Sequence, residues 1–410
     1  MDILQNFQKK KLSNGITVIH EKRDLPLVSL SITNPIGAAH ETEEIKGIAH
    51  LIEHLIFTGT KKRSSEQISG EIEKKGGILN AFTSHNATSF WFKLPSKNIF
   101  DGLKILVDIL KNPLFREDKF KKEKSVVLEE IKMYHDNPQI HLMRNLEGNL
   151  YEKPFGMGIG GTKESLSSLN RDFVFKYFKE KYSPENYVVT LIGLADFEKI
   201  CEFLEKEFPK NKKPKTPQPK IIPIIKKNAE NVEERAHIDQ AHFAFGVHAP
   251  MPTEKEIFVL EVLDSYLSQG MSSKLVIEIR EKRDLAYNIT SSIDYEKNYS
   301  NYTIYVGTNT KAIPEVKKLI LKGFKDIIKN FTPKDLKESK EMLIGLRKVS
   351  SEESIGVMNA LAFSELIYNR AEKFYEYEQN INSVTIEEVK SLAKKLPLEY
   401  STSAIIPKTD

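Results

Sequence analysis

A Pro- and Lys-rich segment near the middle of the chain constrains the fold more than any other feature. The run Pro209-Lys-Asn-Lys-Lys-Pro-Lys-Thr-Pro-Gln-Pro-Lys220 disfavours helix and central strand, because proline lacks the backbone N–H that both require. We therefore predict an extended linker over residues 209–223. At 410 residues the chain is too long for one ordinary core. Two domains are expected, residues 1–208 and 224–410. A long surface loop inside one domain is the less favoured alternative.

Composition indicates a globular protein and argues against several classes. Hydrophobic residues make up 40% of the chain and charged residues 29%, which is enough for sizeable cores. The net charge of +4 is spread along the sequence and argues against a nucleic-acid-binding surface. No apolar run reaches the roughly 18 residues of a membrane span, and the N-terminal residues do not resemble a secretory signal. We therefore expect a cytoplasmic protein that makes no contact with a membrane.

Strand and helix patterns follow one another without a regular alternation. Short β-branched stretches predict strands, and apolar residues at helical spacing predict the helices between them. This mixture indicates an α+β fold in which helices pack on one face of an antiparallel or mixed sheet. In the first half, the predicted strands are 15–20, 28–33, 88–94 and 188–192, and the predicted helices are 47–57, 66–75, 99–110, 117–134 and 172–181.

The two halves of the chain resemble each other. Residues 71–80, then a Thr/Ser-rich strand and a helix from Ile99, parallel residues 278–288, then strand 300–306 and helix 313–328. Self-similarity of this kind indicates a duplicated structural unit. We therefore expect two homologous α/β sandwich units in tandem.

The segment His50-Leu-Ile-Glu-His54 is the strongest functional signal. Its imidazoles stand at i and i+4, one helical turn apart, and Glu53 lies between them, so all three can reach one face of a helix. Histidines on a helix are often ordinary core or surface residues. Here the carboxylate beside them favours a metal site. The opposite face of this helix is aliphatic, formed by Ile48, Leu51, Ile52, Leu55 and Ile56.

The predicted helix 117–134 offers a third metal ligand. A catalytic zinc takes three protein ligands and keeps a fourth position for water, and the single Cys201 excludes a cysteine cage. On a helical projection Glu130 shares a mostly apolar stripe with Glu123, whereas Glu129 lies on a polar face. Glu130 is therefore the expected ligand. Glu123, two turns earlier, is expected to support the site, with a surface ion pair as its alternative.

Together these motifs resemble the pitrilysin-type (M16) zinc metallopeptidases, specifically the half-length group that includes mitochondrial processing peptidase. His50 to His54 match the family's inverted His-x-x-Glu-His motif, and its third ligand, a Glu about 76 residues further on, falls on Glu130. Residues 76–83 match its Gly-Gly-x-x-Asn-Ala-x-Thr strand. Arg280 and Tyr287 match its Arg followed seven residues later by Tyr. The resemblance covers nearly the whole chain and implies the LuxS/MPP-like metallohydrolase fold.

The resemblance also implies how a substrate binds. Asn80, Ala81 and Phe82 would form an edge strand to which a peptide adds in an extended conformation. Arg280 and Tyr287 would hold the scissile carbonyl and the developing oxyanion, since both side chains are hydrogen-bond donors. Packing plus a surface Arg is the alternative for this pair. One Zn²⁺ per chain and a homodimer that encloses a chamber are further expectations.

The sequence therefore predicts a zinc-dependent endopeptidase that cleaves unstructured peptides. Glu53 would be the general base that takes a proton from an activated water and passes it to the leaving amine. A non-catalytic scaffold subunit of the same family is the alternative, and a zinc hydrolase acting on another substrate class is a second.

Other chemically capable residues receive no catalytic role. The second half does not repeat the His-x-x-Glu-His motif, and Asp264 and Ser265 occupy the corresponding region. Cys201 is expected to be a packed thiol in a helix. The remaining histidines, including His135 and His141, lack ligand spacing.

Overall fold

Two compact units, each with its own sheet and core, make up the computed structural model, which describes residues 6–209 and 222–408. Both units mix strands and helices in the predicted α+β manner. Residues 210–221 of the predicted linker lie outside the described part of the chain. No helix within the described residues is long and apolar enough to cross a membrane.

The sheet of the first unit has the strand order β1-β2-β6-β3-β5-β4, in which only the β2–β6 pair is parallel. Leu30 of the central strand pairs with Phe92 on one side and Leu191 on the other, and all three are fully buried. β4 forms one edge of this sheet. The strands are β1 (Phe7–Lys11), β2 (Thr17–Glu21), β3 (Leu27–Asn34), β4 (Ile78–Thr83), β5 (Thr88–Pro95) and β6 (Val188–Gly193).

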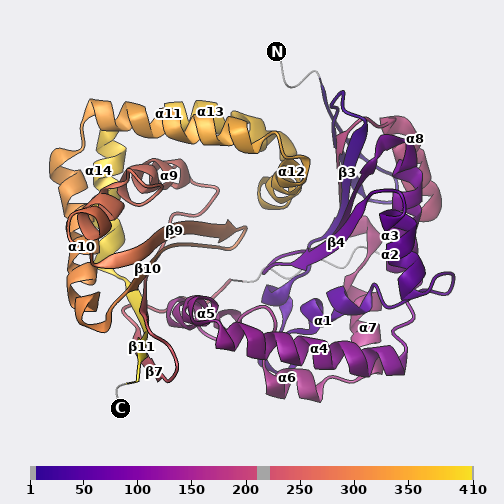
Figure 1. Ribbon diagram of the computed structural model, residues 1–410. Coiled ribbons are helices and arrows are strands. Elements are labelled where there is room, and N and C mark those ends of the chain that lie inside the picture. The colour runs from indigo at the N-terminus through magenta and orange to yellow at the C-terminus, as the bar shows by residue number, and fades with distance from the viewer. Residues whose placement is uncertain (1–5, 210–221, 409–410) are drawn as a thin grey trace. The chain divides into compact units, whose positions relative to one another are not determined.

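Helices cover both faces of this sheet (Figure 1). One face carries α2 (Ser65–Glu73), α3 (Ile99–Lys111) and α8 (Phe197–Glu207), whose buried apolar residues recur at helical spacing. The other face is covered over β3 and β6 by α12 (Ser354–Tyr368). The remaining helices of the first half are α1 (Ile48–Leu55), α4 (Glu117–Asp136), α5 (Pro138–Leu150), α6 (Lys163–Ser168) and α7 (Arg171–Lys181).

The sheet of the second unit repeats the core of the first. Its order is β7-β11-β8-β10-β9, and the antiparallel run β8-β10-β9 corresponds to β3-β5-β4. α10 follows β10 as α3 follows β5, in line with the predicted repeat. The strands are β7 (Glu230–Arg235), β8 (Ala241–His248), β9 (Ala286–Glu296), β10 (Tyr299–Thr308) and β11 (Ser401–Pro407).

One face of the second sheet is covered by a layer of helices, and α5 packs on β8 and β11 at the other face (Figure 1). Gly246 of β8 makes room for α5, because a Cβ there would lie 3.0 Å from the Leu146 side chain. The helices of the second half are α9 (Glu256–Leu267), α10 (Ile313–Asn330), α11 (Pro333–Ser350), α12, α13 (Tyr377–Asn382) and α14 (Ile386–Lys395).

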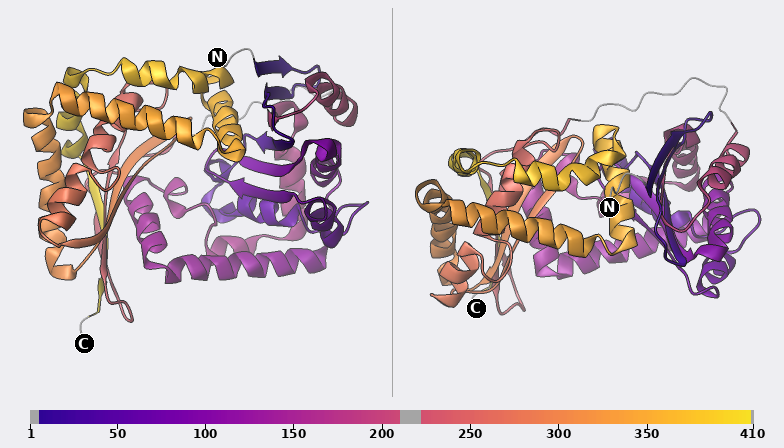
Figure 2. Two further views of the ribbon diagram at one scale, coloured as in Figure 1. Left: turned by 45° about the horizontal axis from the view of Figure 1, so that its top comes forward. Right: turned by 90° about the horizontal axis from the view of Figure 1, so that it is seen from above.

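The two units exchange one segment each, so their bounds differ from the predicted division at residues 208 and 224. Lys132–Gly158, which contains α5, belongs to the second unit, and Ser350–Tyr375, which contains α12, belongs to the first (Figure 2). The physical reason is apolar burial. Met358 and Leu361 of α12 are fully buried in a cluster with Ile19 and Ile192 of the first sheet. An open sheet face with such residues needs a cover, and α12 provides it.

Candidate metal centre

α1 begins at a glycine that no other residue can replace without strain. Gly47 adopts φ +93°, and a Cβ there would lie 2.5 Å from the Gly160 carbonyl oxygen. The five aliphatic residues predicted for the buried face of α1 are all fully buried. His50, Glu53 and His54 are only half-buried. The helix therefore turns its apolar face to the core and its polar face toward β4 and α4, as the helical pattern predicts.

A buried ion pair holds the first turn of α1. The carboxylate of Glu41 accepts hydrogen bonds from the backbone N–H groups of Gly47 (2.9 Å) and Ala49 (2.8 Å), as suits a helix N-terminus. Lys46 lies 3.7 Å from this carboxylate and donates to the Ala38 carbonyl oxygen, and both charged side chains are fully buried. Burial raises the pKa of Glu41 to about 7, against the effects of Lys46 and the two amides. No local pattern in the sequence indicates this pair.

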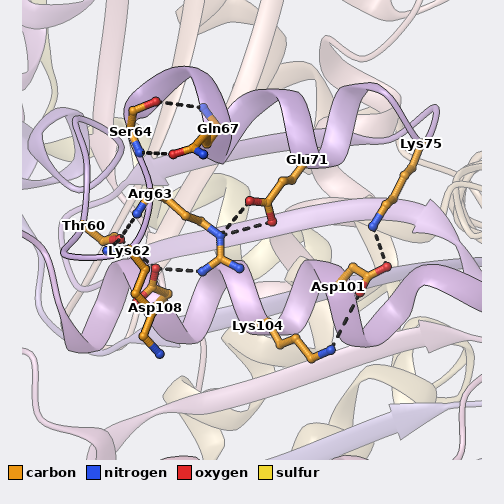
Figure 3. Close-up of polar contacts among 10 residues, drawn as sticks. All are labelled: Thr60, Lys62, Arg63, Ser64, Gln67, Glu71, Lys75, Asp101, Lys104 and Asp108. Atoms are coloured by element: carbon orange, nitrogen blue, oxygen red, sulfur yellow. Dashed lines mark hydrogen bonds and ion pairs between the residues drawn. The ribbon is translucent and has the colours of Figure 1, made fainter.

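The loop that leaves α1 is tied to the neighbouring helices (Figure 3). Thr60 donates to Asp108 of α3 at 2.7 Å, and Arg63 donates to the same carboxylate at 2.8 Å. Arg63 also binds both oxygens of Glu71 in α2 at 3.1 Å. The loop after α1 is therefore held by polar contacts to the buried carboxylate of Asp108.

The side chains of His50, His54 and Glu130 converge between α1 and α4. Glu130 Oε2 lies 3.7 Å from His50 Nε2 and 3.5 Å from His54 Nε2, and the three donor atoms are all within 4.8 Å of one another. Tetrahedral zinc with ligand distances of about 2.0–2.1 Å separates its donor atoms by about 3.3–3.4 Å. Glu130 Oε2 is also buried without a hydrogen bond. A metal ion would satisfy it, so these residues fit zinc.

Glu123, two turns before Glu130 on α4, also lies beside His54. Its Oε2 lies 3.5 Å from Nδ1 of His54, which leaves Nε2 for a metal, the usual arrangement of a ligating histidine. Burial lowers the pKa of His54, but the hydrogen bond to Glu123 and the charges of Glu130 and Glu53 outweigh it, so the pKa is raised overall. The carboxylates therefore favour positive charge at this position. Val126, which the helical projection puts on the same stripe, is exposed, whereas Val127 is fully buried.

Glu53 lies beside the ligand group and is held by the edge strand. Thr83 of β4 donates to Glu53 Oε2 at 2.6 Å. Burial raises the pKa of Glu53, and the hydrogen bond from Thr83 acts in the opposite direction. A carboxylate with a raised pKa is suited to accept and return a proton near neutral pH. Thr83 is predicted only as part of a matching strand, and its contact with Glu53 is a structural finding.

The residues predicted to bind substrate lie on the edge strand β4. Asn80 is exposed, and Ala81 and Phe82 are half-buried. The backbone N–H of Ala81 donates to the side-chain oxygen of Asn80 at 2.7 Å. The ring of Phe82 stacks on Phe363 of α12, with centroids 6.1 Å apart. Thr83, one residue after Phe82, therefore connects the edge strand β4 to Glu53.

Arg280 and Tyr287 lie in the second unit. Arg280 is in the π-helix Val276–Glu281, where its guanidinium lies 3.5 Å from Met271 Sδ and from a Glu281 carboxylate oxygen. Tyr287 is the second residue of the edge strand β9 and is 65% exposed. Both donors are therefore accessible on their own unit.

In the second unit, α9 is the first α-helix after β8, as α1 is the first after β3 in the first unit. Asp264 of α9 is buried and accepts hydrogen bonds from Ser268 (2.7 Å) and Tyr302 (2.8 Å). Ser265 donates to the Val262 carbonyl oxygen within the same helix. These contacts satisfy the polar groups of α9 inside the core, and they explain how this helix packs without metal ligands. Cys201 is a buried thiol in α8, as expected.

Comparison with known proteins identifies the family. Residues 17–163 match the family model described as insulinase (peptidase family M16), and residues 168–343 match the one described as peptidase M16 inactive domain. An uncharacterized zinc protease of Bacillus subtilis is 30% identical over 405 residues, which cover 96% of this chain and 97% of the relative. The chain belongs to the M16 peptidase family.

A further relative and two solved structures agree with this chain in length and fold. An uncharacterized zinc protease of Rickettsia felis is 29% identical over 422 residues, covering 99% of this chain and 98% of that protein. The crystal structure of a protease from Helicobacter pylori superposes with a TM-score of 0.90 at 23% identity, covering 98% of this chain and 99% of that one. The crystal structure of a peptidase M16 inactive domain from Pseudomonas fluorescens superposes with a TM-score of 0.88 at 20% identity. The match covers 98% of this chain and 98% of that one. The tandem M16 fold is thereby confirmed.

Replacing Glu130 and Glu129 separately tests the ligand group. We expect Glu130→Gln to weaken zinc binding by about 100-fold or more, since even outer-sphere partners of ligands are worth about 10–100-fold. Glu129→Gln should bind zinc as the unchanged chain does, because Glu129 is on the exposed side of α4. Zinc competition with a chromophoric chelator measures both. Equal affinities in the two variants would contradict the assignment of Glu130.

Proposed function

We propose that this M16 protein is a zinc-dependent endopeptidase whose metal is held by His50, His54 and Glu130. The observation that carries this proposal is the spacing of the three donor atoms, 3.5–3.7 Å from carboxylate to imidazoles, with Glu53 beside them. The names of the zinc proteases among its relatives support the same metal. We propose one catalytic zinc per chain.

His50, His54 and Glu130 would hold zinc, which when bound would supply Lewis-acid polarisation of a peptide carbonyl and activation of a water molecule. Glu53 accepts the proton of that water and delivers it to the leaving amine. Its raised pKa matches this double task, and Thr83 fixes the carboxylate that carries the proton. Glu123 keeps the His54 ring oriented by accepting from Nδ1–H. No covalent enzyme intermediate is required.

The edge strand β4 supports an extended peptide as the substrate. A strand at the edge of a sheet binds another strand through main-chain hydrogen bonds, which recognise extended peptides with little sequence preference. The N–H of Ala81, now bonded to Asn80, is exposed and can pair with a substrate carbonyl. The link through Thr83 then brings such a peptide next to Glu53.

The second unit contributes two donors in this proposal. Arg280 and Tyr287 bind the scissile carbonyl and the oxyanion that develops from it. Their exposure and the donor character of both side chains support the role. The family resemblance supports a homodimer with a chamber that admits unstructured peptides.

Glu53→Gln tests catalysis separately from metal binding. The amide keeps the shape of the side chain but cannot act as a base, so zinc content should stay near normal while turnover falls by about 10²–10⁴-fold or more. Chelator-sensitive cleavage of an unstructured peptide mixture, mapped by mass spectrometry, is the measurement. No cleavage by the unchanged, zinc-loaded protein would favour a scaffold subunit. Full activity of Glu53→Gln would remove Glu53 from its role.

Thr83→Val tests how Glu53 is tuned. The Thr83 hydroxyl lowers the pKa of Glu53, so its removal should raise that pKa further. Because the base must be ionised, the acidic limb of the kcat/KM profile should move to higher pH. Thr17→Val in β2 is the matched control, since Thr17 is a half-buried strand residue in the same sheet. An unchanged acidic limb in Thr83→Val would show that this hydroxyl does not influence the base.

Tyr287→Phe tests the donor in the second unit. Loss of one oxyanion donor typically costs about 2.7–4 kcal/mol, which corresponds to about 10²–10³-fold in kcat. Zinc affinity should not change. Tyr266→Phe is the control, because that ring packs on Phe331. Equal rates for both variants would leave Tyr287 without a catalytic role.

A further inference from the structure

A second group of metal-ligating side chains lies in the second unit. Donor atoms of His135, His141 and Glu233 are all within 4.8 Å of one another. They come from three elements: the last turn of α4, the beginning of α5 and the strand β7. None of them belongs to the catalytic group on α1.

The break between α4 and α5 brings the two histidines together. Asn137 begins α5 by accepting from the N–H of Ile140, and Pro138 follows at the first helical position. The chain turns there, so two rings six residues apart reach a centroid distance of 4.5 Å. Within one continuous helix, residues i and i+6 point in different directions. A ligand search by helical spacing therefore misses this pair.

Glu233 is already oriented as a metal ligand would need to be. Arg235 binds its Oε1 through two nitrogens, at 2.7 and 3.2 Å. Its other oxygen, Oε2, lies 2.8 Å from His141 Nε2 and accepts from Asn145 at 3.2 Å. Outer partners that fix a carboxylate in this way are a regular feature of metal sites.

Burial and neighbouring charges act on the side chains of this cluster. Burial lowers the pKa of His141, although Glu233 acts in the opposite direction. Burial alone would raise the pKa of Glu233, but bonds from Arg235 and His141 outweigh this, and the pKa is lowered. Arg235 Nη2 lies 3.5 Å from His135 Nε2 and donates to that ring nitrogen, a contact that a metal ion bound at Nε2 would displace.

We propose that His135, His141 and Glu233 form a second zinc site, weaker than the one on α1. Two imidazoles and one carboxylate are a donor set for a transition metal such as zinc rather than for calcium or magnesium. The hydrogen bond from Arg235 to His135, which a metal ion would displace, and the exposure of His135 account for the lower affinity. Bound zinc joins the end of α4 and the start of α5 to β7. In the sequence, His135 comes five residues after Glu130.

His141→Gln separates a metal site from a simple ion-pair cluster. The glutamine amide can still donate to Glu233, so the polar link to β7 remains while the imidazole ligand is lost. Equilibrium dialysis against graded concentrations of Zn²⁺ alone should give two ions per unchanged chain and one per His141→Gln chain. His237→Asn is the control, because His237 is exposed, lies outside the cluster and has the positive φ of 61° that Asn tolerates. It should retain both ions.

Glu130→Gln makes the result independent of the catalytic site. In that background we expect the weaker zinc to remain, and Co²⁺ alone should give the visible absorption of a histidine-bound ion. Adding His141→Gln should abolish that absorption. Equal zinc stoichiometry in the unchanged chain and His141→Gln, with no change in the Co²⁺ spectrum, would overturn the second site. If Glu130→Gln loses zinc only at the tighter site, the result still supports His50, His54 and Glu130 as the ligands of the catalytic zinc.

Discussion

The buried carboxylate of Glu41 determines where α1 begins, and the metal ligands depend on that position. Two backbone amides at the start of the helix bond to this one side chain, and Lys46 supplies a compensating charge inside the core. Buried charges are tolerated only with such partners. Because His50 follows Ala49 directly, a shift of the first turn would move the imidazoles relative to Glu130 on α4. The buried contacts of Glu41 thus help to set the distance between the imidazoles and the Glu130 carboxylate.

Local periodicity made much of the site predictable. The aliphatic face of α1 and the choice of Glu130 over Glu129 both follow from helical spacing, and the structure places these side chains accordingly. The strands and helices of the first half also agree with the sequence patterns to within a few residues. Such patterns are reliable here because each element buries one face.

Contacts between distant residues were not predictable in the same way. Thr83 is 30 residues from Glu53, and Glu233 is 92 residues from His141. Local sequence patterns do not relate residues so far apart in the chain. The packing of whole elements brings each pair together. The linker correctly indicates that the chain forms two units. It does not indicate that α5, from the first half of the sequence, packs in the second unit, or that α12, from the second half, packs in the first. This arrangement of α5 and α12 follows from burial of the apolar sheet faces on which the two helices pack.

The exchanged helices also change what a break in the backbone would do. A single cut in the segment 210–221 would separate the two halves of the sequence, but neither fragment would hold a complete core. One would lack the helix that covers Ile19 and Ile192, and the other would lack the helix that packs on β8 and β11. Each fragment carries the piece that the other needs. The nicked protein should therefore behave as a non-covalent complementation pair.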